Sequence, residues 1–269
     1  MSQPIEVFPI HAFEDNYIWV IQNGQYVAVV DPGDAGPVLE FIKRMGLNRS
    51  TVLLTHHHTD HVGGLGGLIQ AFPKGRLKVY GPAKENIPFL TNPLNGHEKI
   101  RLHEINLDLQ VLPIPGHTIG HLAYYGQSLG ANGSVFCGDT LFGAGCGRLF
   151  EGTPAQMESS LEILKQLPGM TLCYCAHEYT LANLKFAAAV EPANLEIQRR
   201  ICATQKLRER EETTVPFTLE GELLTNPFLR LSAPAVQSAA AERLGHPPDG
   251  SVEVLTAIRQ WKDHFRATF

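Results

Sequence analysis

Apolar residues fall into two kinds of block, which predict strands in the first two thirds of the chain and helices in the last third. Up to about residue 177 most apolar runs are short, rich in β-branched residues and bounded by Gly, Pro, Asn or Asp. Such runs predict strands at residues 17–22, 25–31, 51–54, 77–80, 107–114, 121–125, 134–137 and 171–175. Two helices are predicted in the same region at residues 35–45 and 155–167, and a further, glycine-rich helix is predicted between the strands at 51–54 and 77–80.

After residue 177 the pattern changes to long helical stretches, which are predicted at residues 181–190, 195–212, 233–244 and 252–265. The stretches 81–96 and 213–230 show no clear periodicity and are predicted to be irregular. We therefore expect an α/β fold with two domains, residues 1–177 and a mainly helical part at residues 178–269.

Local signals fix some of these boundaries more closely. Asn23-Gly24 separates the first two strands and predicts a hairpin, since these residues tolerate the positive φ angles of a type I′ turn. Asp34 and Thr153 stand where the two early helices begin and are predicted to be their N-caps. Gly46 is predicted to end the first of these helices.

Composition narrows the class of protein. The chain has 269 residues, of which 43% are hydrophobic, enough for a substantial core. A net charge of -5 gives no basic surface for nucleic acid, and no apolar run approaches the length of a membrane span. The N-terminus lacks a secretory signal, and five cysteines form no disulfide-like framework. We expect reduced thiols, a cytoplasmic location and a monomer that binds neither nucleic acid nor membrane.

The strongest chemical signal follows the predicted strand at residues 51–54. Four histidines and one aspartate fall within six positions there, and glycines come directly after them: His56, His57, His58, Asp60 and His61. If the strand geometry continues, the side chains of His56 and His58 point to one side and that of His57 to the other. Imidazole and carboxylate groups suit Zn, Fe or Mn. We therefore predict a metal site, with His57 in a packing or supporting role.

Three more candidate ligands stand at the ends of later predicted strands, namely His117, Asp139 and His177. Ligands that converge from several strand ends are a common way to build a site on a sheet. Seven ligands exceed the need of one four-coordinate metal and suit two. We assign His56, His58 and His117 to one metal, Asp60, His61 and His177 to the other, and Asp139 to both as a bridge. Asp31 is either a hydrogen-bond partner of a ligating histidine or a turn residue.

The motifs at 55–61, 115–118 and 138–140 resemble those of the metallo-β-lactamase fold superfamily. More specific stretches resemble glyoxalase II, the hydroxyacylglutathione hydrolase family: residues 145–153, 176–186, 225–230 and 259–263. The resemblance covers essentially the whole chain. It implies a four-layer αββα sandwich with a helical C-terminal domain, the first catalytic and the second substrate-binding.

The same resemblance implies an activity. A binuclear centre would hydrolyse S-D-lactoylglutathione to glutathione and D-lactate, the second step of methylglyoxal detoxification, with Asp60 and Asp139 orienting the nucleophile. We expect two divalent transition metals per chain, zinc ahead of iron or manganese. The family's glutathione contacts correspond to Arg148, Tyr179, Arg259 and Lys262. Phe150 departs from the family, in which this position is often tyrosine, and it removes a hydroxyl that would donate a hydrogen bond.

Three alternative functions are distinguishable. An iron-dependent persulfide dioxygenase of the same superfamily uses one metal, which the seven-ligand set and the helical C-terminal region argue against. A metal-dependent nuclease would need a basic surface, which the charge balance does not indicate. A non-catalytic module with a structural metal would have a closed coordination shell, whereas a surplus of mixed ligands implies open positions.

Overall fold

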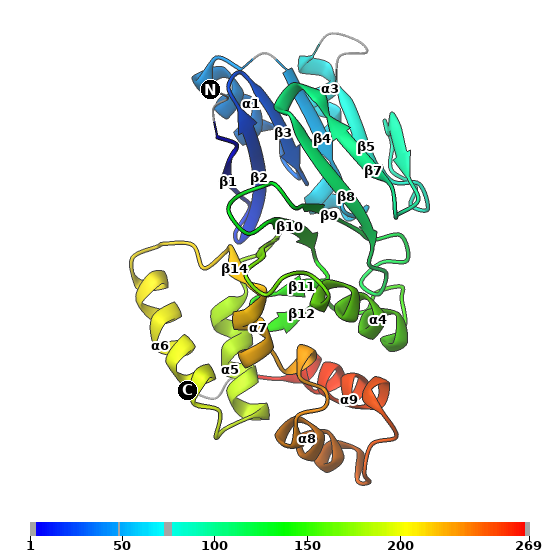
Figure 1. Cartoon of the computed structure of the whole chain (residues 1–269), viewed down its shortest axis with the longest axis vertical. Helices are drawn as coiled ribbons and strands as arrows, with labels where there is room; N and C mark the ends of the chain where they lie inside the picture. The colour runs from blue at the N-terminus through cyan, green and yellow to red at the C-terminus, as the bar shows by residue number, and fades with distance from the viewer. Residues whose placement is uncertain (1–3, 48, 73–76, 267–269) are drawn as a thin grey trace. The chain divides into compact units, whose positions relative to one another are not determined.

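The computed structural model describes residues 4–47, 49–72 and 77–266. The chain forms two compact units, and each consists of two separate segments of the sequence. The N-terminal unit comprises Met1–Pro113 and Ile119–Gly138, and the C-terminal unit comprises Ile114–Thr118 and Asp139–Phe269. Figure 1 labels many of the helices and strands of both units, from the dark blue β1 to the red α9.

The first sheet of the N-terminal unit combines antiparallel and parallel strands. Its strands stand in sequence order: β1 (Glu6–Ala12), β2 (Asn16–Asn23), β3 (Tyr26–Val30), β4 (Arg49–Leu53), β5 (Lys78–Pro82) and β6 (Asn92–Leu94). The strands β1, β2 and β3 pair as hairpins, whereas β3 to β6 are parallel. Parallel pairing requires crossover connections, which contain α1 (Ala35–Met45), α2 (Thr59–Val62) and α3 (Leu65–Ala71).

Both faces of this sheet are buried. Ile18 and Val20 on β2 belong to a core cluster that also contains Val38 of α1 and Leu65 of α3. Trp19, the residue between the two, points to the opposite face because side chains alternate along a strand, and it is only 2% exposed. Burial on both faces explains why these strands are nearly continuous runs of apolar residues.

The second group of strands in this unit is an antiparallel meander. It consists of β7 (Lys99–Leu102), β8 (Leu107–Pro113), β9 (Leu122–Gly126) and β10 (Ser134–Gly138), with the short 3-10 helix η1 (His103–Ile105) between the first two. Two hydrogen bonds join it to the end of β4. The hydroxyl of Tyr124 donates to the carbonyl of Leu54 at 2.7 Å, and the amide of Leu122 donates to the carbonyl of Thr55 at 2.8 Å.

The C-terminal unit is mainly helical. It contains the small hairpin of β11 (Leu141–Phe142) and β12 (Gly145–Cys146), the antiparallel pair β13 (Leu172–Cys175) and β14 (Phe217–Thr218), and seven further elements: α4 (Pro154–Lys165), α5 (Thr180–Val190), α6 (Leu195–Glu209), α7 (Leu219–Thr225), η2 (Pro227–Leu229), α8 (Pro234–Leu244) and α9 (Ser251–His264). A core cluster on α5 and α6 packs against the hairpin through Ala144.

Local capping signals are confirmed. The side chain of Asp34 accepts a hydrogen bond from the amide of Gly36, and Gly46 ends α1 with a left-handed backbone at φ 65°. Thr153 and Gln156 form a capping box at the start of α4, with Pro154 in the first turn. These signals act over a few residues, so the sequence alone sets the bounds of both helices to within two residues.

Three local predictions are wrong. The turn between β2 and β3 consists of Gly24 and Gln25, because Asn23 pairs with Tyr26. Only Gly24 has a positive φ (58°), as type II′ turns require of their first central residue, so the turn is not type I′. The stretch 81–96 contains β6, a short edge strand that tolerates Pro93. The stretch 213–230 contains β14, α7 and η2.

Candidate metal centre and adjoining pocket

Asp31 organises the segment at residues 55–61 of the N-terminal unit, which we call the histidine-rich loop. Its carboxylate accepts hydrogen bonds from the amide and the hydroxyl of Thr55, at 2.8 and 2.7 Å, and lies 3.0 Å from His61 Nδ1. Asp31 is buried and has a positive φ of 50°, a conformation that costs free energy and persists only where contacts fix it. The contact that the sequence suggested between Asp31 and a histidine is confirmed.

Four of the predicted ligands cluster in this loop. His56 Nε2 lies 3.1 Å from His58 Nδ1, and the ring centroids of His56 and His61 are 4.0 Å apart. His61 Nε2 lies 3.5 Å from Asp60 Oδ2, which also accepts a hydrogen bond from the side-chain amide of Asn16. The contact with Asp31 occupies the Nδ1 atom of His61 and fixes the ring with Nε2 toward Asp60, as is usual for metal-ligating imidazoles.

His57 contacts a different part of the unit, as the strand geometry predicted. Its Nδ1 atom lies 2.9 Å from Glu85 Oε2, and the other oxygen of Glu85 accepts a hydrogen bond from the amide of Gly120. His57 therefore links the histidine-rich loop to the segment that contains Glu85, and it is absent from the groups of side chains that could hold a metal in the described residues.

The loop also packs backbone against backbone. A Cβ atom on Gly33 would lie 1.8 Å from the carbonyl oxygen of Asp60, and one on Gly64 would lie 2.4 Å from the carbonyl oxygen of Pro32. Distances this short exclude any side chain at these two positions without movement of the backbone. Gly33 and Gly64 are thus required for the close approach of the two turns.

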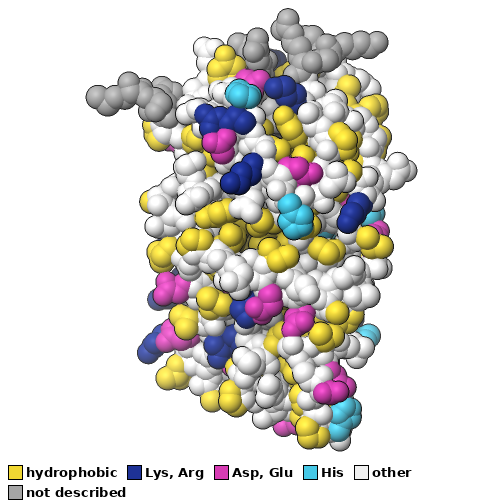
Figure 2. Space-filling view, turned by 45° about the vertical axis from the view of Figure 1, so that its right-hand side comes forward, with side chains coloured by type: hydrophobic (Ala, Val, Ile, Leu, Met, Phe, Trp, Pro, Cys, Tyr) yellow, Lys and Arg dark blue, Asp and Glu magenta, His cyan; other side chains and the backbone are white. Residues whose placement is uncertain are grey.

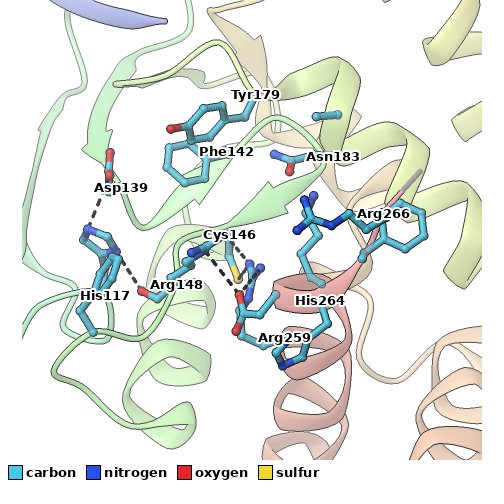
Figure 3. Close-up of a pocket in the computed structure, with 15 residues that line it drawn as sticks. His117, Asp139, Phe142, Cys146, Arg148, Tyr179, Asn183, Arg259, His264 and Arg266 are labelled. Carbon is cyan, nitrogen blue, oxygen red and sulfur yellow. Dashed lines mark hydrogen bonds and ion pairs between the residues drawn. The ribbon is translucent and has the colours of Figure 1, made fainter. Parts of the chain in front are cut away.

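The other three predicted ligands lie together in the C-terminal unit. His117 Nδ1 contacts the carbonyl oxygen of Arg148 at 2.8 Å, and its Nε2 atom lies 3.5 Å from Asp139 Oδ2 (Figure 3). His177 Nε2 lies 3.4 Å from Asp139 Oδ1, the other oxygen of the same carboxylate. Each oxygen of Asp139 thus faces a different imidazole, an arrangement that suits a carboxylate shared between two metals.

The distances and the chemistry of these donors fit metal ions. Separations of 3.4–3.5 Å between imidazole nitrogen and carboxylate oxygen exceed the usual N–H···O hydrogen-bond length. Two ligands bound at about 2.0–2.1 Å to a tetrahedral metal are roughly 3.3 Å apart. All seven residues belong to groups of His and Asp side chains that could hold a metal ion, and the His and Asp clusters fit a binuclear site.

A pocket of about 670 Å³ lies in the C-terminal unit beside His117 and Asp139 (Figure 3). All four residues that the family resemblance assigned to glutathione line it: Arg148, Tyr179, Arg259 and Lys262. The ring of Tyr179 stacks on His177, with centroids 4.8 Å apart. The volume is typical of a small-molecule site. Sequence reasoning missed Phe142, Asn183, Asp263 and Arg266, which also line the pocket.

The cations of the pocket differ in their environments. Arg259 is 5% exposed, and its guanidinium donates to the carbonyl oxygen of Cys146 at 2.8 Å and to Asp263 at 2.9 Å. Arg148 is exposed and lies 3.7 Å from the same Asp263 carboxylate. Burial, together with the neighbouring charges of Arg259 and Arg148, lowers the pKa of Lys262 to about 8.

Outside the pocket, charge is mixed. On the face shown in Figure 2, basic and acidic side chains are interspersed, and apolar side chains lie between them. No helix in the described part of the chain combines the length and the apolar character that crossing a bilayer requires.

Comparison with known proteins identifies the class first. The sequence profile of the metallo-β-lactamase superfamily matches residues 12–177, so the fold and the His and Asp clusters define a protein of that superfamily. The profile of the hydroxyacylglutathione hydrolase C-terminus matches residues 178–265. The hydroxyacylglutathione hydrolase of Nitrosomonas eutropha is 47% identical over 262 residues, covering 97% of this chain and 100% of that protein. The chain therefore belongs to the hydroxyacylglutathione hydrolase family, and the predicted family resemblance is confirmed.

Solved structures agree on the fold. BLEG-1, a B3 metallo-β-lactamase, aligns with a TM-score of 0.62 at 21% identity, over 84% of this chain and 99% of that one. TTHA1623 in a di-iron-bound form aligns with a TM-score of 0.51 at 30% identity, over 63% of this chain and 91% of that chain. The predicted α/β class, with mixed sheets, helices and a helical C-terminal region, is confirmed. The full-length relationship does not favour the persulfide dioxygenase alternative.

Proposed function

We propose that this enzyme is a binuclear metal-dependent thioester hydrolase that converts S-(2-hydroxyacyl)glutathione to glutathione and a 2-hydroxy acid, with S-D-lactoylglutathione and D-lactate as the principal pair. One observation supports this above all. A single pocket is lined both by the candidate ligands His117 and Asp139 and by the cations Arg148 and Lys262. Glutathione thioesters carry carboxylates remote from the thioester carbon, and Arg and Lys are the usual partners of carboxylates.

The proposed centre uses the seven predicted ligands. His56, His58 and His117 would hold one metal, Asp60, His61 and His177 the other, and Asp139 would bridge the two. Zinc is the preferred metal, since its chemistry suits mixed imidazole and carboxylate ligands and it has no redox activity. When bound, such metals supply a hydroxide nucleophile near neutral pH and a Lewis acid for the thioester carbonyl.

The chain's own residues supply orientation. Asp60 and Asp139 would accept hydrogen bonds from the attacking water and direct it to the thioester carbon. Arg148, Tyr179, Arg259 and Lys262 would fix the glutathione portion, so that the acyl group stands beside His117 and Asp139. The thiolate product is a good leaving group, so the chain needs no dedicated general acid. In this proposal residues 1–177 carry the chemistry, residues 178–269 complete the substrate site, and the enzyme acts as a monomer.

Metal content and hydrolysis, measured on the same preparation, test the proposal. We expect about two equivalents of transition metal per chain, as mixed seven-ligand sets allow. We also expect loss of absorbance of S-lactoylglutathione upon addition of the enzyme. Full activity with one equivalent under saturating metal would contradict the binuclear centre. Two equivalents of metal per chain without thioester hydrolysis would contradict the proposed activity but would support the binuclear centre.

Phe150 gives a prediction about substrate affinity. Its ring is 62% exposed, lines the pocket, and meets the ring of His117 edge-on at 5.3 Å. Phe150→Tyr would add a hydroxyl donor at the pocket wall, and a net hydrogen bond contributes about 0.5–1.5 kcal/mol. We expect KM for S-lactoylglutathione to fall roughly two- to tenfold with kcat nearly unchanged. The control substrate is a small thioester without the glutathione portion, for which KM should not change. A KM that rises for S-lactoylglutathione would contradict a hydrogen-bonding role at this position.

A further inference from the structure

The turn of the β11–β12 hairpin is buried in the C-terminal unit and is bound by polar side chains from distant parts of the chain. We call residues 141–146 the pocket hairpin. Its carbonyl groups accept hydrogen bonds from the side-chain amide of Asn183 at Gly143 (3.1 Å), from that of Asn226 at Gly145 (3.0 Å), and from the guanidinium of Arg259 at Cys146 (2.8 Å). Buried backbone carbonyls need such partners, so these contacts fix the path of the turn.

Glu222 of α7 also binds the pocket hairpin, but as a hydrogen-bond acceptor. Its carboxylate is fully buried and accepts a hydrogen bond from the amide of Ala144 at 2.7 Å. Ala144 has a φ of 54°, a region that residues other than glycine rarely adopt. The same carboxylate oxygen accepts from the side chain of Asn226 at 2.9 Å, and the other oxygen pairs with Arg200 at 2.5 Å. An oxygen acceptor at this position therefore holds the unusual turn in place.

The pocket hairpin lies directly beside residues of the candidate metal centre. It begins two residues after Asp139, and its base is closed by a hydrogen bond from the amide of Gly147 to the carbonyl of Thr140 at 3.1 Å. A Cβ atom on Gly147 would lie 1.9 Å from the carbonyl oxygen of Asp139, so the two backbones touch. Phe142 of the hairpin meets the rings of His177 and Tyr179 edge-on, at 5.9 and 5.3 Å.

We propose that Glu222 and Asn226 are positioning residues, which act through the pocket hairpin to hold Asp139 and His177 in the geometry that binds metal. This role rests on the proposed metal function of Asp139 and His177. It assigns a task to the irregular-looking stretch 213–230, which contains neither a predicted ligand nor a predicted substrate contact. The ion pair with Arg200 uses the other oxygen of the Glu222 carboxylate, so the contact with the hairpin depends on a single oxygen.

Three variants separate positioning from general stability. Glu222→Ala and Asn226→Ala remove hairpin contacts, and Asn226→Ala leaves the Arg200–Glu222 pair intact. Glu222→Gln keeps an oxygen that can accept from Ala144 while it removes the charge. Glu191→Ala is the matched control, because Glu191 is also buried and paired with an arginine, Arg230, at 2.8 Å, and its side-chain contacts with Arg230 and Asn194 lie outside the hairpin.

The readout is metal affinity by chelator competition, with thermal unfolding of the metal-free protein measured alongside. We expect Glu222→Ala and Asn226→Ala to weaken metal binding about ten- to a hundredfold, the range typical of groups that orient ligands, and Glu222→Gln and Glu191→Ala by no more than about threefold. If Glu222→Ala does not fold, Asn226→Ala alone decides. Parent-like metal affinity in Asn226→Ala, or a loss in Glu191→Ala as large as that in Asn226→Ala, would overturn the proposal. A parent protein that binds no metal would instead contradict the proposed function.

Discussion

Asp139→Asn is expected to reduce bound metal from about two equivalents to one or fewer and to lower kcat for S-lactoylglutathione by about a hundredfold or more. The reason is the position of its carboxylate, which faces His117 with one oxygen and His177 with the other. An amide keeps the shape of the side chain but offers one oxygen and no negative charge. Metal analysis and steady-state kinetics on the same sample measure both effects.

Asp263→Asn is the control for this prediction. Asp263 is also a carboxylate of the pocket, but it pairs with Arg148 and Arg259. We expect this variant to keep its metal and to alter KM more than kcat. Two metal equivalents and parent activity in Asp139→Asn would show that Asp139 is not a bridging ligand.

The second large effect concerns pH. Because the pKa of Lys262 is lowered to about 8, its ammonium is present below pH 8 and is lost as pH rises through that value. In the proposed complex the charged form binds a substrate carboxylate, so kcat/KM for S-lactoylglutathione should fall as pH increases from 7 to 9. The pH dependence of kcat/KM reports the pKa values of groups in the free enzyme, which is the state in which the pKa of Lys262 is lowered. A charged hydrogen bond contributes about 1.5–3 kcal/mol, which corresponds to roughly ten- to a hundredfold in kcat/KM.

Two variants of Lys262 test the assignment. Lys262→Arg should remain charged and lose the fall near pH 8, whereas Lys262→Met should start from a low kcat/KM and show no fall there. A small thioester without carboxylates should give the same pH profile with all three proteins. If the fall near pH 8 persists in Lys262→Met, another group is responsible for it.

The parts of the fold that the sequence predicted well are those set by nearby residues. The bounds of α1 follow from Asp34 and Gly46, both adjacent to the helix. The opposite directions of His56 and His57 were predicted by continuing the strand alternation, although β4 itself ends at Leu53. In contrast, α7 depends on contacts across the unit, since Glu222 binds a backbone amide 78 residues earlier in the chain. No local pattern reports such a partner, so the segment looked irregular.

The candidate site shows the same limit. The spacing of Arg259 and Lys262 correctly placed both on one side of the last helix, and both line the pocket. It did not reveal that Arg259 is buried and bound to Cys146, 113 residues away, while Lys262 has a lowered pKa. Whether these residues bind glutathione remains a prediction. The contact of Asp31 with a histidine could be suggested from the sequence, as an alternative to a turn role, because carboxylates commonly bind the second nitrogen of a metal-ligating histidine.

The glycine contacts in the histidine-rich loop have a consequence for how this enzyme can change its substrate preference. Gly33 and Gly64 touch neighbouring backbone so closely that any side chain there would displace the loop. Substitutions at these positions would therefore disturb the loop itself before they could alter specificity. Arg148 and Phe150 are exposed at the pocket wall, where substitutions usually cost little stability. A change of preference toward other acyl or thiol groups is thus more accessible through the pocket of the C-terminal unit than through the loop.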